Sequence, residues 1–266
     1  LRDFYQDLVP EVLRKSLGEF YTPDWLVEFT IDKFNISDWR NIRALDPTCG
    51  SGSFLIELIR RKKKQYEKQN LSPREIVENI CDTVWGFDLN PLAVQTARVN
   101  FLMEIASLLK VAPGMNIEIP ILLADAIYSP AKDPDQSIPI VKYSIGSQVA
   151  KLDIVLPTEL AFNREQLDQV FESMGESVEE NLEFDIAKEI MLESGIISKE
   201  HIFNWSSPLK KTYDQVLNLH RNNWNGIWFR IVRNFFWSAT AGKFDIVVGN
   251  PPWVRWSKLP VSYRER

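Results

Sequence analysis

Three acidic residues follow apolar runs of the sequence and could together hold a nucleoside ligand. Asp46 begins the turn Asp46-Pro47-Thr48-Cys49-Gly50-Ser51-Gly52, whereas Asp88 and Asp125 each close a further run. A carboxylate beside such a glycine turn attracts an ammonium group and would repel a pyrophosphate. A carboxylate at the end of the next strand can accept both hydroxyls of a ribose, and a third can accept from the amine of an adenine. Taken singly, the glycine turn could be only a tight turn and Asp88 only a helix cap.

The most specific string in the chain is Asn250-Pro251-Pro252-Trp253. The two prolines remove two backbone donors and fix φ, so the Asn250 amide and the carbonyls of Asn250 and Pro251 can form a rigid cluster of acceptors. Trp253 beside them offers a face on which a base can stack. The alternative is a loop that merely terminates a strand.

The elements that must position these residues begin with four predicted strands. These are apolar runs rich in β-branched residues, each ending in a polar or turn residue, at 42–46, 83–88, 120–125 and 244–250. Helical periods at 54–65 and 91–109 separate the first three. This alternation of strand and helix predicts a doubly wound α/β fold with a mostly parallel sheet. Asp46 and Asp88 are 42 residues apart, more than a compact unit needs, because 62–82 is predicted to form a charged extension.

A long insertion precedes the fourth run, and it is too long to lack structure of its own. Residues 126–242 are predicted to form a mostly helical, acidic part with a short strand at 153–156 and helices at 164–174, 178–193 and 209–237. The loop 128–147 is expected to be flexible. We therefore predict that the chain is divided into three parts. Residues 1–125 form the cofactor-binding part, 126–242 form the insertion, and 243–266 contain the fourth strand and the Asn-Pro-Pro-Trp loop.

Composition excludes disorder and a disulfide scaffold, because 45% of the 266 residues are hydrophobic and there are two cysteines. No uncharged apolar run is long enough to span a membrane, so we expect a cytoplasmic protein. The net charge is −5, but 153–200 holds 13 acidic and 3 basic residues, a local −10, so the remainder sums to +5. An acidic average is therefore no objection to a DNA substrate. We interpret the basic run 60–64 as the solvated end of a helix; the alternative is a segment that contacts phosphates.

The combined motifs resemble the S-adenosylmethionine-dependent DNA adenine-N6 methyltransferases. Specifically, they resemble the members of that family in which the glycine motif comes before the catalytic motif in the sequence. Similar sequences form the methylase part of type IIG and type I restriction-modification or phage-exclusion systems. The segment Gly18-Glu19-Phe20-Tyr21-Thr22-Pro23 resembles the one that precedes the sheet in these DNA enzymes. That segment disfavours protein-glutamine methyltransferases, which share the Asn-Pro-Pro string. The motifs span 18–256, although 126–242 matches only loosely.

The resemblance implies a Rossmann-like methyltransferase fold, S-adenosylmethionine as cofactor, double-stranded DNA with a flipped adenine as substrate, and no metal. Asn250, Pro251, Pro252 and Trp253 would be catalytic, with the amine held by the Asn250 oxygen and the Pro251 carbonyl. The positions matched to cofactor-binding motifs are Phe20, Tyr21, Thr22, Asp46, Pro47, Gly50, Gly52, Phe54, Asp88, Leu89, Asp125 and Ala126.

The family carries further strands and a target-recognition domain or specificity subunit after the catalytic motif. The resemblance therefore predicts that this chain is a fragment that is inactive by itself. Its sheet is expected to lack the strands that follow the catalytic motif in the family. Two alternatives remain from the sequence. One is a methyltransferase acting on RNA or on protein glutamine, and the other is a non-catalytic cofactor-binding module of a defence complex.

Overall fold

The computed structural model describes residues 22–66, 71–126, 131–133, 140–146, 151–222, 229, 233–234, 236–238 and 241–253. The chain forms two compact units, one made of Leu1–Ala126 with Lys243–Arg266 and the other of Ile127–Gly242. The first and last parts of the division predicted from the sequence therefore fold together, and the insertion is a unit by itself.

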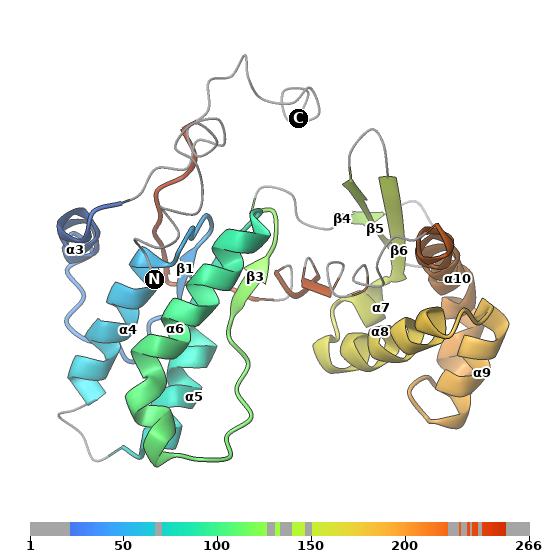
Figure 1. Ribbon diagram of the computed structural model, residues 1–266, viewed down its shortest axis with the longest axis horizontal. Helices are drawn as coiled ribbons and strands as arrows, with labels where there is room; N and C mark the ends of the chain where they lie inside the picture. Colours follow the sequence, from blue (N-terminus) through green and yellow to red (C-terminus); the bar gives the residue numbers. More distant parts are fainter. Residues whose placement is uncertain are drawn as a thin grey trace. The chain divides into compact units, whose positions relative to one another are not determined.

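The first unit contains a parallel sheet of four strands in the order β3-β2-β1-β7. Figure 1 labels β1 and β3 of this sheet. The strands are β1 Ala44–Asp46, β2 Val84–Asp88, β3 Ile121–Leu123 and β7 Ile246–Val247. Ala44 pairs with Val84 on one side and with Ile246 on the other, so the strand that comes last in the chain lies directly beside the first. All four predicted runs contain a strand, and the predicted α/β fold with a parallel sheet is confirmed.

The helices of this unit are α3 Asp24–Asp32, α4 Ser53–Tyr66, α5 Pro73–Thr83 and α6 Pro91–Val111. Leu58, Ile80 and Phe101 of the last three share one hydrophobic core with Ala44 and Val84 of the sheet. Because side chains alternate along a strand, this core lies on a single face of the sheet. The helices α4, α5 and α6 also pack on one another.

Helix α5 corrects the predicted charged extension. It begins after Ser72, whose side chain accepts from the Glu75 N–H while the Glu75 carboxylate accepts from the Ser72 N–H, and Pro73 occupies the first turn. This capping box starts a helix that buries Ile76, Val77 and Ile80. The described residues between Asp46 and Asp88 thus contain two helices rather than one.

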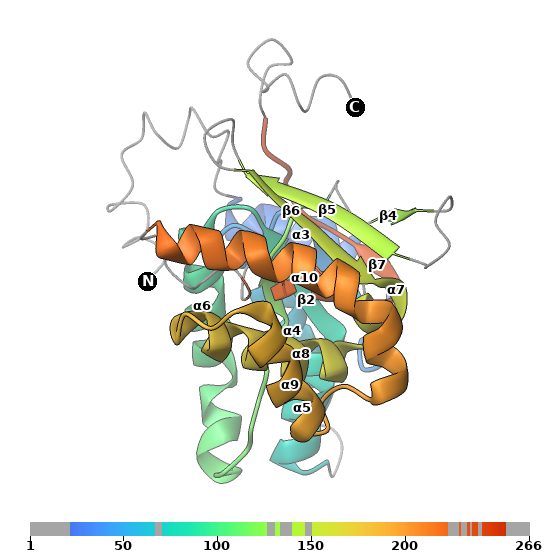
Figure 2. The same cartoon turned by 90° about the vertical axis from the view of Figure 1, so that its right-hand side faces the viewer.

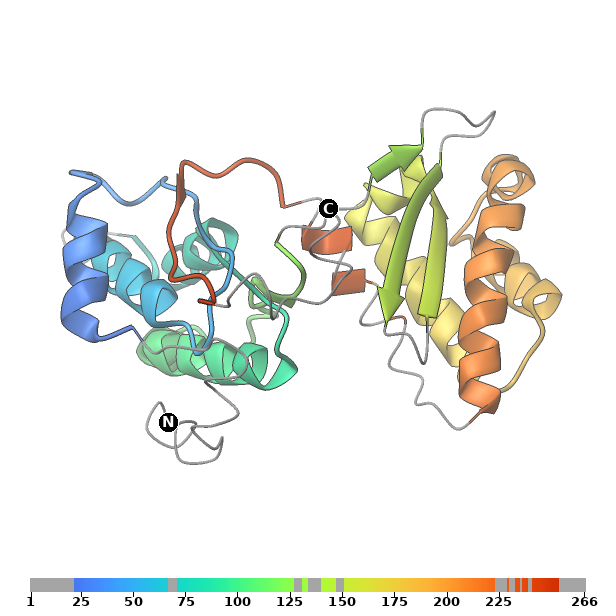
Figure 3. The same cartoon turned by 90° about the horizontal axis from the view of Figure 1, so that it is seen from above.

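The second unit pairs an antiparallel sheet with helices. The sheet has the order β4-β5-β6, with β4 Ala131–Asp133, β5 Ile140–Gly146 and β6 Lys151–Pro157. The helices are α7 Thr158–Ala161, α8 Arg164–Glu179, α9 Phe184–Glu193 and α10 Lys199–Arg221. Figure 2 shows α10 running along β6, and Figure 3 shows the sheet and the helices from above.

Several predicted bounds within this unit were wrong. The expected flexible loop 128–147 contains β4 and β5, and the strand predicted at 153–156 is the central part of β6. A single helix was predicted at 178–193, but α8 continues to Glu179 and α9 begins at Phe184. Helix α10 starts ten residues before the predicted 209, because Ser198 caps it and Pro208 is tolerated inside it.

Polar side chains of α10 protect the outer edge of β6. The Thr212 hydroxyl donates to the Val155 carbonyl at 2.8 Å and accepts from the Val155 N–H at 2.9 Å. The Gln215 amide makes the equivalent pair of bonds to the backbone of Asp153, at 2.7 and 2.9 Å. An exposed strand edge invites pairing with other chains, and this helix closes it.

Among the described residues, one helix, Pro91–Val111, is long and apolar enough by length and composition to cross a membrane. It is α6, whose Ala97 and Phe101 lie in the core of the first unit. Its Arg98 donates to the Ile121 carbonyl and its Glu104 pairs with Lys63 of α4. These contacts are those of a helix packed on a sheet.

Candidate active site

The carboxyl ends of the parallel strands bring the predicted site residues to one edge of the sheet. Asp46 and Asp88 are the last residues of the neighbouring strands β1 and β2, and Asn250 follows β7 on the other side of β1. Ligands of open α/β sheets bind at this edge. Side chains predicted from separate motifs therefore lie around the same end of the sheet.

The turn after β1 is tied to the end of β2 by hydrogen bonds. The Cys49 N–H donates to the Phe87 carbonyl at 2.8 Å, and the Gly50 N–H donates to Oδ2 of Asp88, also at 2.8 Å. Oδ1 of Asp88 accepts from the Asn90 N–H. Each carboxylate oxygen has two lone pairs, so Asp88 is held in place and can also accept from hydroxyls.

Asn90, and not Asp88, caps helix α6. The Asn90 side chain accepts from the Leu92 N–H at 2.9 Å, and Pro91 occupies the first position of the helix. The alternative role for Asp88, a helix cap, is thereby excluded. Its carboxylate instead joins the two turns that follow β1 and β2.

Asp46 is a deeply buried acid. Its side chain is 1% exposed, and Oδ1 accepts from the Thr48 N–H at 3.1 Å. Burial raises the pKa of the Asp46 carboxyl to about 8; the Thr48 hydrogen bond opposes this shift, and the negative charge of Asp88 adds to it. A cationic ligand would bring a positive charge to a carboxyl whose surroundings disfavour its ionised form.

Glycine is required at the two glycine positions of the turn for different structural reasons. Both adopt left-handed backbone, with φ of 55° at Gly50 and 87° at Gly52. A Cβ at Gly50 would meet nothing within 4 Å, so this backbone faces open space, as a site for a ligand requires. A Cβ at Gly52 would lie 3.3 Å from the Ala97 side chain, so Gly52 lets α4 begin close to α6.

The remaining predicted cofactor positions differ in exposure. Leu89 is 54% exposed directly after Asp88, Ala126 is exposed, and Asp125 is 9% exposed. Phe54 is 4% exposed within the hydrophobic core, so packing accounts for this residue and we do not assign it to the ligand. Phe20 and Tyr21 lie outside the described residues.

The loop after β7 is anchored at its base and exposed at its tip. The Val248 N–H donates to the Leu45 carbonyl, which extends the pairing of β7 with β1. Asn250 is half-buried, whereas Pro251, Pro252 and Trp253 are exposed. The Asn250 Nδ2 donates to Oγ1 of Thr22 at 3.3 Å, and the Trp253 Nε1 donates to Oδ1 of Asn250 at 3.0 Å.

Gly249 is a site residue whose role the motif alone does not reveal. A Cβ built at this position would collide with the Oδ1 atom of Asp46 and lie 3.2 Å from its Cγ atom. Only glycine therefore lets the backbone before Asn250 lie against the buried carboxyl. The signal was present in the sequence as a glycine directly before the Asn-Pro-Pro string.

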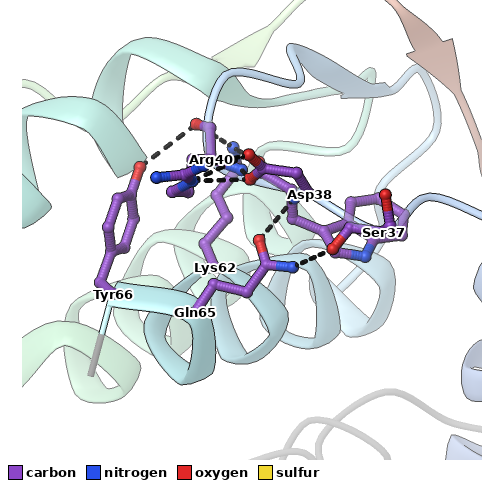
Figure 4. Close-up of polar contacts among 7 residues, drawn as sticks. Ser37, Asp38, Arg40, Lys62, Gln65 and Tyr66 are labelled. Carbon is purple, nitrogen blue, oxygen red and sulfur yellow. Dashed lines mark hydrogen bonds and ion pairs between the residues drawn. The ribbon is translucent and has the colours of Figure 1, made fainter. Parts of the chain in front are cut away.

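Helix α4 fixes the segment that leads into β1, as Figure 4 shows. The buried Lys62 ammonium donates to the carbonyl of Arg40 at 3.0 Å. It also donates to the carbonyl of Ile42 at 2.9 Å and to that of Trp39. Tyr66 donates to the same Arg40 carbonyl. Burial lowers the pKa of Lys62 to about 8.

The interpretation of 60–64 as a solvated helix end was therefore wrong for most of the run. Lys62 is buried, Arg61 pairs with Glu57 and with Asp32 of α3, and Lys63 pairs with Glu104 of α6. These basic side chains hold α3, α4 and α6 together around the strand that carries Asp46.

This architecture is that of an α/β protein whose candidate site residues lie at the carboxyl edge of a parallel sheet. Residues 3–141 match the family described as N-6 DNA methylase, and residues 82–265 match the family described as Eco57I restriction-modification methylase. The chain belongs to the N-6 DNA methylases of restriction-modification type.

Three curated relatives agree with this assignment. The chain is 32% identical over 111 residues to the adenine-specific methyltransferase PglX of Streptomyces coelicolor, covering 39% of this chain and 9% of the relative. It is 29% identical over 100 residues to the type II methyltransferase M.VspI of a Vibrio species, covering 37% and 20%. It is 24% identical over 102 residues to the methylase subunit of the type I restriction enzyme MjaIX of Methanocaldococcus jannaschii, covering 38% and 16%. These matches span a fifth or less of the relatives' lengths.

Proposed function

We propose that this chain carries the methyl-donor site and the catalytic loop of an enzyme that methylates the N6 amine of adenine in DNA, with S-adenosylmethionine as donor. The observation that carries the proposal is the meeting of Asp46, Asp88 and the Asn250 loop at one edge of the sheet. The matched family is described as N-6 DNA methylase, and this description favours DNA over RNA or protein glutamine as the substrate.

The surroundings of Asp46 fit the ammonium group of the donor. A carboxyl that is buried and lies near a second acid gains most from a ligand that brings a positive charge. When bound, S-adenosylmethionine supplies a methyl group activated by its sulfonium. The open backbone at Gly50 leaves room beside this acid for the ligand.

The end of β2 fits the ribose and the base of the same ligand. Asp88 is held by the N–H groups of Gly50 and Asn90, and its two oxygens can accept the two ribose hydroxyls. The exposed Leu89 side chain can cover an adenine ring, and Asp125 can accept from the ring's amine. Pro47 and Ala126 border these positions in the chain.

The Asn250 loop fits the target adenine. An adenine amine is a weak nucleophile because its lone pair is delocalised into the ring. Hydrogen bonds from the amine to the Asn250 oxygen and the Pro251 carbonyl would localise that lone pair and direct it toward the methyl group. As the new N–C bond forms, the bond between the methyl group and the donor sulfur would break, the sulfonium would become a neutral thioether, and the amine would lose one proton to solvent. Positioning of this kind can lower a barrier by several kcal/mol.

Trp253 is placed to stack on a base that has left the duplex. The side chain is 74% exposed, two residues after the Pro251 carbonyl. An adenine amine cannot be reached inside a base pair, so the enzyme must extrude the base and stabilise it. A stacking contact of this type is worth about 1–3 kcal/mol per base.

Asn250→Ala in the full-length protein tests the proposal. Because this change removes the acceptor without touching Asp46, single-turnover formation of N6-methyladenine should fall at least ~100-fold while binding of S-adenosylmethionine stays within about 3-fold. Asp46→Ala should instead abolish cofactor binding. Asn222→Ala, which removes an amide at the end of α10, is the matched control and should leave both properties unchanged. Undiminished methylation by Asn250→Ala would refute the assignment.

A further inference from the structure

Two hydrogen bonds define the orientation of the Asn250 amide. Its nitrogen donates to the Thr22 hydroxyl oxygen at 3.3 Å, and its oxygen accepts from the Trp253 indole at 3.0 Å. An indole N–H can only donate, so the amide atom that faces it must be the oxygen. The Thr22 hydroxyl can accept from the amide nitrogen, so its position agrees with the orientation that the indole selects.

Thr22 is itself held by the fold. Its side chain is 8% exposed and lies directly before α3, where the Pro23 carbonyl accepts from the Val27 N–H. Val27 belongs to the hydrophobic core, and Arg61 of α4 pairs with Asp32 at the other end of α3. The hydroxyl therefore has a fixed position relative to the sheet that carries Asn250.

We propose that Thr22 is a positioning residue for the methyl transfer, because its hydroxyl holds the Asn250 nitrogen and so fixes the place at which the Asn250 oxygen meets the target amine. This inference rests on the proposed function. If the amide were reversed, it would present N–H donors to an amine that must itself donate. The hydrogen bond that the amine needs would then be lost, and with it the alignment of the lone pair.

The Trp253 contact marks the place of the incoming amine. The indole N–H uses one of the two lone pairs of the Asn250 oxygen, and the amine N–H would donate to this same atom. The bond to Thr22 uses the other end of the amide, so it does not depend on Trp253 when that side chain turns to stack on the base. Thr22 is thus the contact that can hold the amide in place throughout the reaction.

Thr22→Val and Thr22→Ser in the full-length protein form the test, since valine keeps the shape of threonine without its hydroxyl and serine keeps the hydroxyl. At saturating S-adenosylmethionine, the single-turnover rate of Thr22→Val should fall about 5- to 30-fold, the loss expected for one hydrogen bond with its misorientation. Thr22→Ser should stay within about 2-fold. Thr22→Ala should reproduce the valine result if valine impairs folding.

Two results would overturn the inference. One is a Thr22→Val rate that recovers fully at saturating cofactor, because Thr22 would then serve only the methionine end of the ligand. The other is a Thr22→Ser variant as slow as Thr22→Val, because the hydroxyl would then be irrelevant. Failure of the proposed function has a different signature. It requires Asn250→Ala to retain methylation, whereas an active Thr22→Val beside an inactive Asn250→Ala defeats the positioning role alone.

Discussion

Replacing Asp46 by asparagine should stabilise the ligand-free protein at neutral pH while it removes cofactor binding. The folded state raises the pKa of this carboxyl from an ordinary value near 3.8 to about 8, so the folded state binds a proton that the unfolded state releases. Stability therefore falls as the pH rises from about 4 to 8. At about 1.4 kcal/mol per unit, the cost in the wild type is about 2 kcal/mol at about pH 5 and about 5 kcal/mol at about pH 7.5.

The asparagine variant has no ionisable group at this position, so the pH dependence of the difference between the two proteins isolates the Asp46 carboxyl. Urea unfolding at about pH 5 and about pH 7.5, followed by a signal from the first unit, should give a stability gain for Asp46→Asn that is about 3 kcal/mol larger at the higher pH. Any constant cost of burying the amide cancels in this comparison. A difference that is equal at both pH values would refute the reasoning, because Asp46 would then be ionised in the empty site.

Three further outcomes follow from the packing. Thr212→Val should destabilise the second unit by about 2–3 kcal/mol in chemical denaturation, since it leaves a strand-edge amide and carbonyl unsatisfied, and Thr212→Ser should cost less than about 1 kcal/mol. Lys62→Met should cost about 3 kcal/mol or more, because the carbonyls of Trp39 and Ile42 lose their donor and that of Arg40 keeps only Tyr66; a change below about 1 kcal/mol would show that water replaces the ammonium. Gly249→Ala should weaken cofactor binding at least ~10-fold in calorimetry, because a methyl group collides with Asp46; unaltered binding would contradict that close contact.

The parts of the fold that could be predicted are those whose signal is local. Each core strand lies within a short, mostly apolar run of the sequence, and the acids that end β1 and β2 appear in the sequence at those ends. Helix α6 begins at Pro91 as its sequence predicts. These features depend on neighbours in the chain, so a sequence pattern suffices to find them.

The features that were missed depend on partners distant in the chain or on a weaker local signal. The strands β4 and β5 have polar, proline-containing surroundings, and they gain their structure by pairing with each other and with β6. Lys62 looks like part of a charged helix end, but the loop before β1 covers it. Helix α5 is the exception, because its Ser72 and Glu75 capping box is a local signal that stands among many charged residues.

The same distinction holds at the candidate site: local motifs predict which residues belong to it, but not which of them touch each other. Sequence patterns identified Asp46 and Asn250 separately, each from its own motif. Their relation follows from the pairing of β1 with β7, which matches Leu45 with Val247 and brings Asp46 and Gly249, just beyond that pair, against each other. A side chain at 249 would displace either the buried acid or the loop that presents Asn250. The glycine therefore serves both motifs at once, and neither motif, taken alone, explains why it must be there.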